Sequence, residues 1–258
     1  MLKHSYIKWI FIVLIFGGFV IWFFDKIPLY VLIFVLIFWL ILTVWASFDM
    51  RMNYFVKTHS SNKKVNRNVI ALTFDDGPTE ITPEILNLLE KFNQKATFFC
   101  IGKQVEKYPE IAKRLVNEGH TIANHTWSHT NKMGFLPEKD VVNEIVSNQK
   151  TIKKATGKEC HLFRPPFGVT NPNIAKACNK LNLLVIGWNI RSLDTVISSK
   201  TKILNRIIPR IKKGSVILLH DTSQKTADVL EQLLIDLKEK EFQSVPVDEL
   251  LQIKAYKE

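Results

Sequence analysis

Two apolar runs without a charged residue fill most of the first 48 positions. They span residues 10–24 and 29–48 and are separated by Asp25-Lys26-Ile27-Pro28. A helix needs about 20 apolar residues to cross a bilayer, which the second run provides and the first provides if residues 7–9 join it around Lys8. Aromatic residues suited to a membrane interface lie near the ends of the runs: Tyr6, Trp9, Trp22, Tyr30 and Trp45. We therefore expect a transmembrane hairpin over residues 1–48.

A cleaved signal peptide is the alternative interpretation of the first run. The second run follows immediately, and no obvious small-residue cleavage site separates the two, so the hairpin is favoured. A hairpin leaves both flanks on one side of the membrane, and these flanks carry Lys3, Lys8, Arg51 and Lys57, against Lys26 in the turn. The positive-inside rule therefore favours a cytoplasmic location for everything after residue 48.

The remaining sequence divides into a linker and one domain. Residues 49–66 are polar and basic and are predicted to form a juxtamembrane linker. From residue 67 to 258, apolar strand patterns alternate with amphipathic helix patterns, which predicts parallel βα units. Strands are expected at 69–74, 96–101, 121–124, 183–189 and 215–219, with Phe163 before a further turn and 242–247 leading into a last short helix. Helices are expected at 82–92, 109–118, 137–155, 173–181, 201–211 and 226–238.

Composition limits the classes of partner. The net charge of +11 is spread over many lysines without dense basic runs, so nucleic acid is a poor match and anionic headgroups or an anionic polymer are better ones. The three cysteines, Cys100, Cys160 and Cys178, form no CxxC pair. They indicate neither a disulfide framework nor a thiolate zinc site and are expected to be buried.

Titratable residues follow three of the expected strands. Asp75 and Asp76 end the first, His125 and His129 follow the strand at 121–124, and His220 ends the strand at 215–219. Ligands bind at strand ends in α/β proteins, so these groups are expected to meet in one site. Two histidines four residues apart can converge on one metal ion, with a carboxylate as a natural third ligand.

Four motifs in order carry a resemblance to a known family. They are Thr73-Phe74-Asp75-Asp76-Gly77, His125-Thr126-Trp127-Ser128-His129, Arg164-Pro165-Pro166-Phe167-Gly168 and Leu218-Leu219-His220-Asp221. Together they resemble the polysaccharide deacetylases, carbohydrate esterase family 4 with the NodB homology domain, over roughly residues 67 to 258. The resemblance implies a distorted (β/α) barrel, for which we count about seven parallel strands, here preceded by the two transmembrane helices.

The resemblance also implies roles for the first motifs. Asp76, His125 and His129 would hold one divalent metal ion, and Asp75 would be the general base. Zinc is the default ion for such ligands, with Co²⁺, Ni²⁺ or Mn²⁺ as alternatives. Two carboxylates this close repel each other, so Asp75 needs a cation; Arg164 is the expected one, and the family motif gives it the role of orienting the base.

The later motifs supply the remaining groups. His220 would be the general acid, with Asp194 as the carboxylate behind it. The backbone N–H of Phe167 would help hold the oxyanion, and Leu219 would line the pocket for the acetyl methyl. We expect Asp221 to cap the following helix.

The segment around Asp194 departs from the family pattern W-x-x-D-x-x-D-W. Trp188 and Asp194 match it, but Arg191 replaces the first aspartate and Thr195 the final tryptophan. The loss of an aromatic wall bears on the substrate class rather than on the catalysis. Arg191 either favours an anionic group on the substrate or is a solvated surface arginine.

Three functions remain open from the sequence. The first is a membrane-anchored, metal-dependent deacetylase that removes N-acetyl or O-acetyl groups from peptidoglycan or another N-acetylglucosamine-containing polymer. The second is a deacylase of a lipid-linked sugar at the membrane, and the third is an inactive glycan-binding domain. A polymer substrate implies an extracytoplasmic domain, against the preference of the flanking charges.

Overall fold

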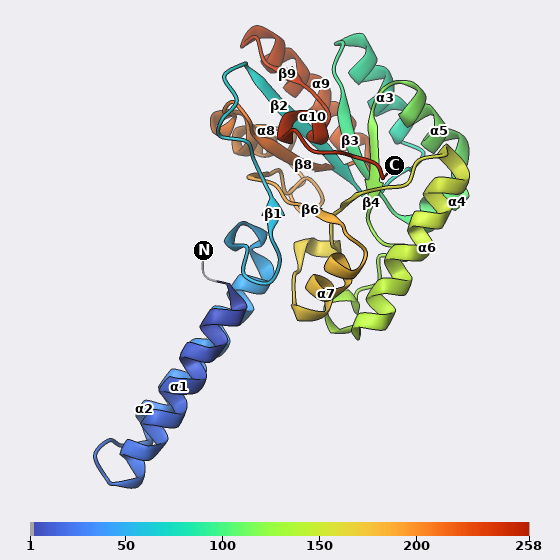
Figure 1. The fold of residues 1–258 in the computed structure, drawn as a ribbon. Helices are drawn as coiled ribbons and strands as arrows, with labels where there is room; N and C mark the ends of the chain where they lie inside the picture. Colours follow the sequence, from blue (N-terminus) through green and yellow to red (C-terminus); the bar gives the residue numbers. More distant parts are fainter. Residues whose placement is uncertain (1–2, 258) are drawn as a thin grey trace.

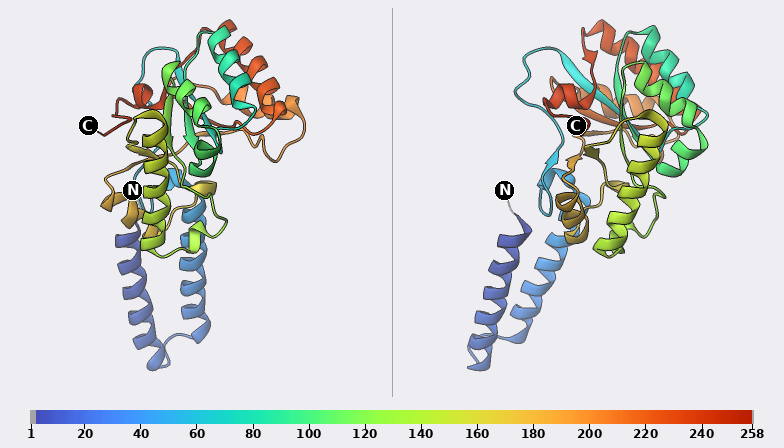
Figure 2. Two further views of the ribbon diagram at one scale, coloured as in Figure 1. Left: turned by 90° about the vertical axis from the view of Figure 1, so that its right-hand side faces the viewer. Right: turned by 45° about the vertical axis from the view of Figure 1, so that its right-hand side comes forward.

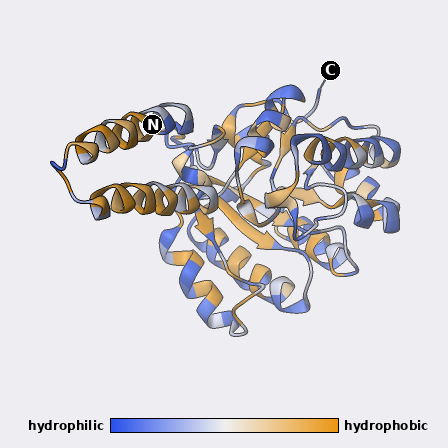
Figure 3. Ribbon diagram, turned by 90° about the horizontal axis from the view of Figure 1, so that it is seen from below, coloured by the Kyte–Doolittle hydropathy of each residue, from blue (hydrophilic) through white to orange (hydrophobic). Residues whose placement is uncertain are grey.

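The N-terminal residues form two long antiparallel helices that project from the rest of the molecule. In the computed structural model, which describes residues 3–257, these are α1 (His4–Phe23) and α2 (Leu29–Phe48), packed side by side (Figure 1). Both are long and apolar enough to cross a membrane. Apolar residues surround each helix on all sides rather than forming one stripe (Figure 3). The prediction of two apolar N-terminal helices is confirmed.

A curled sheet of nine parallel strands forms the centre of the remaining chain. The strands are β1 (Thr58–His59), β2 (Val69–Asp75), β3 (Ala96–Cys100), β4 (Thr121–Asn124), β5 (Leu162–Phe163), β6 (Leu184–Ile186), β7 (Ile190–Arg191), β8 (Val216–His220) and β9 (Gln243–Ser244). Their order is β1-β6-β5-β4-β3-β2-β8-β7, with β9 paired to β2, and every pair is parallel. The predicted (β/α) barrel is confirmed, in the form of an open half-barrel.

Helices connect the strands and cover the sheet from outside (Figures 1 and 2). They are α3 (Thr82–Lys91), α4 (Gly102–Lys107), α5 (Pro109–Asn117), α6 (Glu138–Thr156), α7 (Pro172–Lys180), α8 (Lys200–Ile207), α9 (Gln224–Glu239) and α10 (Val247–Leu251). The largest core cluster joins alternate residues of β2, β3 and β8, such as Phe74, Phe98 and Leu219, to apolar residues of α3, α8 and α9. The sheet residues between them face the inside of the half-barrel.

The segment predicted as a linker is packed onto the domain. Met50, Tyr54 and Thr58 are buried, and β1 pairs with β6 at the edge of the sheet. At least the first half of residues 49–66 is therefore part of the folded structure, which corrects the linker prediction. Like β7, β1 has two residues, too few to show a periodic pattern in the sequence. These two short strands explain why we count about seven strands and the sheet has nine.

The parallel strands bring the predicted site residues to one edge. Asp75 ends β2 and His220 ends β8, while His125 and Arg164 directly follow β4 and β5. Carboxyl ends of parallel strands lie together, so four segments far apart in the chain meet there. The same edge receives the end of the hairpin, where the Thr170 N–H donates to the carbonyl of Ser47 at 2.9 Å.

Candidate active site

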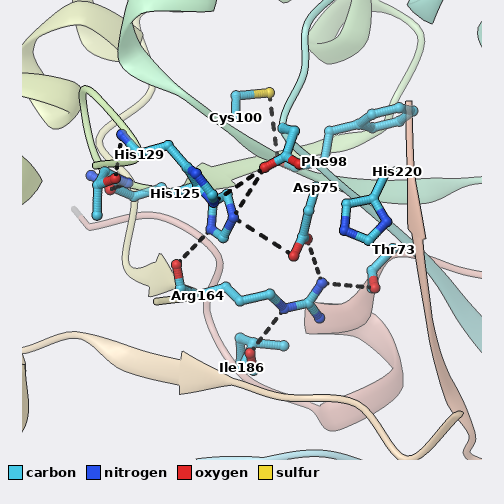
Figure 4. A network of polar contacts seen from close by, with 12 residues as sticks. Thr73, Asp75, Phe98, Cys100, His125, His129, Arg164, Ile186 and His220 are labelled. Atoms are coloured by element: carbon cyan, nitrogen blue, oxygen red, sulfur yellow. Dashed lines mark hydrogen bonds and ion pairs between the residues drawn. The ribbon is translucent and has the colours of Figure 1, made fainter. Parts of the chain in front are cut away.

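Asp75 is held by a completely buried arginine. Arg164 Nη1 lies 2.6 Å from Asp75 Oδ1 and 3.0 Å from the Thr73 hydroxyl (Figure 4). Its other nitrogens donate to the carbonyls of Ile186 and Gly187, at 3.1 and 3.0 Å. Burial lowers the pKa of this guanidinium, and the Asp75 charge opposes that shift. Each of the three guanidinium nitrogens thus has a hydrogen-bond acceptor, and the carboxylate beside the buried cation is fixed in position.

Asp76, His125 and His129 form a compact group of donor atoms. The Nε2 atoms of His125 and His129 lie 3.5 and 3.4 Å from Asp76 Oδ1, and the three ligand atoms lie within 4.8 Å of one another. Asp76 Oδ1 is buried and has no hydrogen-bond partner. Burial would raise the pKa of Asp76, but the contact with His125 and the charges of the histidines outweigh it and lower the pKa to about 2. An ionised, under-coordinated oxygen facing two imidazoles fits a cation.

The loop between the histidines is shaped by a network of hydrogen bonds. His125 Nδ1 lies 2.7 Å from the Arg164 carbonyl, so Nε2 is the ring nitrogen left to face Asp76. Thr126 and His129 both take positive φ values, 66° and 51°. Such a turn is costly for side chains of this kind and needs support from its surroundings.

Two residues that the sequence analysis missed give this support. Glu144 accepts from both the N–H and the hydroxyl of Ser128, each at 2.8 Å. Asn148 donates to the Cys100 carbonyl and to Asn124, whose Oδ1 receives the Thr126 N–H. Asn148 is fully buried on the apolar face of α6, between Ile145 and Ile152. A polar residue at that position of the helical repeat is a signal that could have identified it.

His220 and Asp194 form the second titratable pair. His220 Nδ1 lies 2.8 Å from Asp194 Oδ1, and the His220 N–H donates to Oδ2 at 2.8 Å. The hydroxyls of Ser192 and Thr226, also missed in the sequence, donate to the same carboxylate. Burial would lower the pKa of His220, but the bond and charge of Asp194 outweigh it and raise the pKa to about 8. The His220 imidazole therefore carries a proton near neutral pH.

Phe167 lies at the rim of the same group. It occupies the turn Pro166–Gly168 with a positive φ of 60°. Its ring packs edge to face against the His129 ring, with the two ring centres 4.7 Å apart. The side chain is 48% exposed, so it borders the opening of the site.

Comparison with known proteins agrees with this geometry. The family model of polysaccharide deacetylase matches residues 62–186. A peptidoglycan-N-acetylglucosamine deacetylase of Bacillus cereus is 34% identical over 213 residues, covering 81% of this chain and 76% of that protein. The chain belongs to the polysaccharide deacetylase family.

Other relatives extend the comparison. The crystal structure of the Bc1960 peptidoglycan N-acetylglucosamine deacetylase superposes with a TM-score of 0.72 at 34% identity, covering 77% of this chain and 94% of that one. Peptidoglycan-N-acetylmuramic acid deacetylase PdaC of Bacillus subtilis is 34% identical over 75% of this chain but only 41% of its own length. The peptidoglycan deacetylases among the relatives are therefore named after two different sugars, N-acetylglucosamine and N-acetylmuramic acid.

Leu219 does not line the pocket that the resemblance implies for it. It pairs with Phe74, and both belong to the core cluster under the helices. Leu218 pairs with Thr73, which contacts Arg164 inside the half-barrel. Side chains alternate along a strand, so Leu218 shares the inner face with His220 and Leu219 does not. The Leu219 prediction is wrong on this geometry, and Leu218 takes its place as the pocket candidate.

Asp221 is not a helix cap. The residue that caps α9 is Ser223, whose side chain accepts from the Thr226 N–H. Asp221 is fully buried and instead accepts from the Thr82 hydroxyl at 2.6 Å. A Cβ added at Gly77 would collide with its carboxylate, so this glycine permits the close approach. Burial raises the pKa of Asp221 to about 7.

The departures from the family pattern lie at the β7 edge of the sheet. Thr195 is exposed, and Arg191 is exposed with its guanidinium carbon 5.8 Å from the centre of the Trp188 ring. The polysaccharide deacetylase fold thus tolerates both replacements without disturbing Asp194, which stays buried against His220.

The two leucines of β8 should separate stability from substrate contact. We expect Leu219→Ala to lower the free energy of unfolding by about 2–5 kcal/mol through a core cavity, with kcat/KM close to wild type while folded. Leu218→Ala should lower kcat/KM by about tenfold or more, because a shortened pocket wall loses contact with the substrate. Denaturant unfolding and acetate release measure the two effects. A larger loss of kcat/KM in Leu219→Ala would contradict the assignment.

The His220–Asp194 pair should control the basic limb of the pH profile. An imidazole that donates a proton is active below its pKa of about 8, so kcat/KM should fall as pH rises through that value. Asp194→Asn removes the charge that stabilises the imidazolium, so the limb should move towards about pH 6.5, the ordinary value for histidine. Ser192→Ala, which keeps the carboxylate, is the control and should shift it less. An unmoved limb in Asp194→Asn would rule out this pair.

Proposed function

We propose that this protein hydrolyses N-acetyl groups of a glycan with the help of one divalent metal ion. The observation that carries the proposal is the convergence of three groups at one sheet edge. These are the Asp76–His125–His129 donor set, the Arg164-held carboxylate of Asp75, and the His220–Asp194 pair. Amide hydrolysis needs an activated water, a stabilised oxyanion and a proton for the leaving amine, and each need has a candidate group here.

The donor set fits a divalent ion of the borderline kind. Two imidazole nitrogens and one carboxylate oxygen are typical ligands of zinc, and Co²⁺, Ni²⁺ and Mn²⁺ accept the same set. The buried Oδ1 of Asp76, without a hydrogen-bond partner, supports a cation at this position. When bound, such an ion supplies a Lewis acid that polarises the acetyl carbonyl and makes water more acidic.

The chain's own residues would handle the protons. Asp75 Oδ2 lies 3.7 Å from His125 Nε2, so the carboxylate borders the donor set and can take a proton from water there. Arg164 holds Oδ1 of the same carboxylate and thereby orients the base. As the carbon–nitrogen bond breaks, protonated His220 would give its proton to the amine nitrogen, and the Phe167 N–H would face the carbonyl oxygen.

The proposed substrate class rests on the names of the similar proteins. We infer an N-acetylated glycan such as peptidoglycan, with N-acetylglucosamine as the leading sugar, because several similar proteins carry that name. A lipid-linked sugar is the second candidate, favoured by Arg191 and by the hairpin next to the site. An inactive glycan-binding domain is disfavoured because the base, the ligands and the acid are all present.

Asp75→Asn should strongly reduce acetate release without loss of the metal. We expect kcat to fall by about 10²–10⁴-fold on an N-acetylglucosamine oligomer, because amide oxygen is a poor base, while one metal ion per chain stays bound. Chelator treatment of the wild type should also stop release, and added Zn²⁺ should restore it. Acetate assay and elemental analysis give both readouts. Wild-type turnover in Asp75→Asn would exclude Asp75 as the base.

We also propose that α1 and α2 anchor the protein in a membrane. Most of their large apolar side chains are exposed, among them Phe16, Phe34 and Leu40. Both helices are bonded to the chain that follows them. At the start of α1 the His4 N–H donates to the Tyr54 carbonyl, and at the end of α2 the Ser47 carbonyl accepts from the Thr170 N–H. A leader removed after α1 would break the stacked Phe11–Trp39 pair, with rings 5.5 Å apart. These contacts favour a retained anchor.

A reporter fused after Glu258 should reveal the side of the membrane. We expect an alkaline phosphatase fusion to be active, because a polymer substrate requires an extracytoplasmic domain, and we expect the chain to resist alkaline extraction from membranes. A fusion at the Lys26 turn is the matched control and should report the opposite side. An inactive C-terminal fusion would move the proposal to a lipid-linked sugar in the cytoplasmic leaflet.

A further inference from the structure

A cavity of about 560 Å³ lies between the end of α2 and the β7–α8 edge of the domain. Its size is typical of small-molecule sites. It is separate from the group of residues assigned above to catalysis, none of which lines it. The lining residues that matter here are Arg51, Arg191, Arg206 and Arg210, with Trp45 and Phe48 from the last turn of α2.

The four arginines exceed the negative charge available to them. Asp49 is the acidic residue of the lining, and both its oxygens are taken by Arg51, at 2.8 and 2.6 Å. Among residues 3–257, the other ion pairs of arginine belong to Arg67, Arg114 and Arg164, which lie elsewhere. Arg191, Arg206 and Arg210 therefore line one cavity without an ion pair to a carboxylate of the described residues.

Backbone contacts hold these unpaired arginines together. Arg206 Nε donates to the Arg191 carbonyl at 3.3 Å, and Arg210 Nη1 donates to the Arg206 carbonyl at 3.0 Å. The side chains thus gather around one cavity although their charges repel. Such an arrangement is stabilised when an anion enters, and guanidinium groups bind phosphate through paired hydrogen bonds.

The other wall of the cavity indicates that the anion carries an apolar group. Trp45 and Phe48 are 62% and 65% exposed at the point where the apolar helix ends and Asp49 begins. Tryptophan at the end of a membrane helix lies at the level of the lipid headgroups. A free phosphate would use the arginines but not these rings.

We propose that this cavity binds the phosphate of an anionic lipid headgroup. The arginines hold the phosphate oxygens, while Trp45 and Phe48 pack against the start of the lipid chains. The site rests on the proposed membrane anchor and not on the proposed reaction. It fixes the domain at the membrane surface through Arg191 on β7, the strand beside the one that ends in His220.

Native mass spectrometry of the full chain in detergent micelles tests the proposal. The probes are phosphatidylglycerol, phosphatidylcholine and inorganic phosphate. We expect the wild type to retain one phosphatidylglycerol, and R206Q/R210Q to retain at least about tenfold less at the same concentration, since two charge-assisted contacts are lost. R67Q/K202Q removes the same amount of charge outside the cavity and should retain wild-type binding. Lys202 lies on α8, as Arg206 does, so this control also changes the same helix.

Each remaining outcome decides the matter. Equal retention in R206Q/R210Q and wild type, or an equal loss in R67Q/K202Q, would overturn the site. Equal retention of phosphatidylcholine would overturn the preference for an anionic headgroup, and displacement by an equal concentration of inorganic phosphate would assign the cavity to free phosphate. The thermal midpoint of each variant checks folding; if the double variant unfolds, R210Q alone, at an exposed position, should show a several-fold loss.

Discussion

The rest of the structure depends on the ion pair between Arg164 and Asp75. The guanidinium is fully buried inside the half-barrel and bonds residues of β2 and the end of β6, while its backbone follows β5. Removing either partner would leave an uncompensated buried charge, which costs about 3–5 kcal/mol. The pair therefore joins the strands and also fixes the carboxylate that faces the donor set. Stability and the orientation of the proposed base come from one interaction.

The two adjacent aspartates are separated by their partners rather than by distance. Asp75 turns to Arg164, whereas Asp76, at a positive φ of 78°, turns to the histidines. Like charges this close shift each other's protonation unless each has its own cation. The same principle acts at His220, where Asp194 keeps the imidazole charged. Three carboxylates thus take distinct positions in one small site, and each acquires a different chemical property.

The apolar hairpin and the site are parts of one folded unit. The segment after α2 enters the sheet through β1, and the loop that carries Phe167 is bonded to the last turn of α2 through Thr170. The site therefore has a fixed distance from the end of the apolar helices. With the helices in a membrane, as proposed, the opening would lie at a set distance from a glycan next to the membrane or attached to a lipid. The proposed lipid phosphate in the arginine cavity would bind at the same junction and hold the domain in this position.

The sequence by itself determined the apolar hairpin, the βα alternation and the titratable residues at the strand ends. These are local features, because apolar periodicity and a titratable residue at a strand end are readable without knowing what packs against them. Tertiary structure alone decided the face of β8 to which Leu218 and Leu219 belong, the buried contact of Asp221, and the pairing of β1. It also supplied Glu144 and Asn148 under the histidine turn. Each depends on strand register or on contacts between distant segments, and a two-residue strand or a single buried side chain carries no periodic signal of its partner.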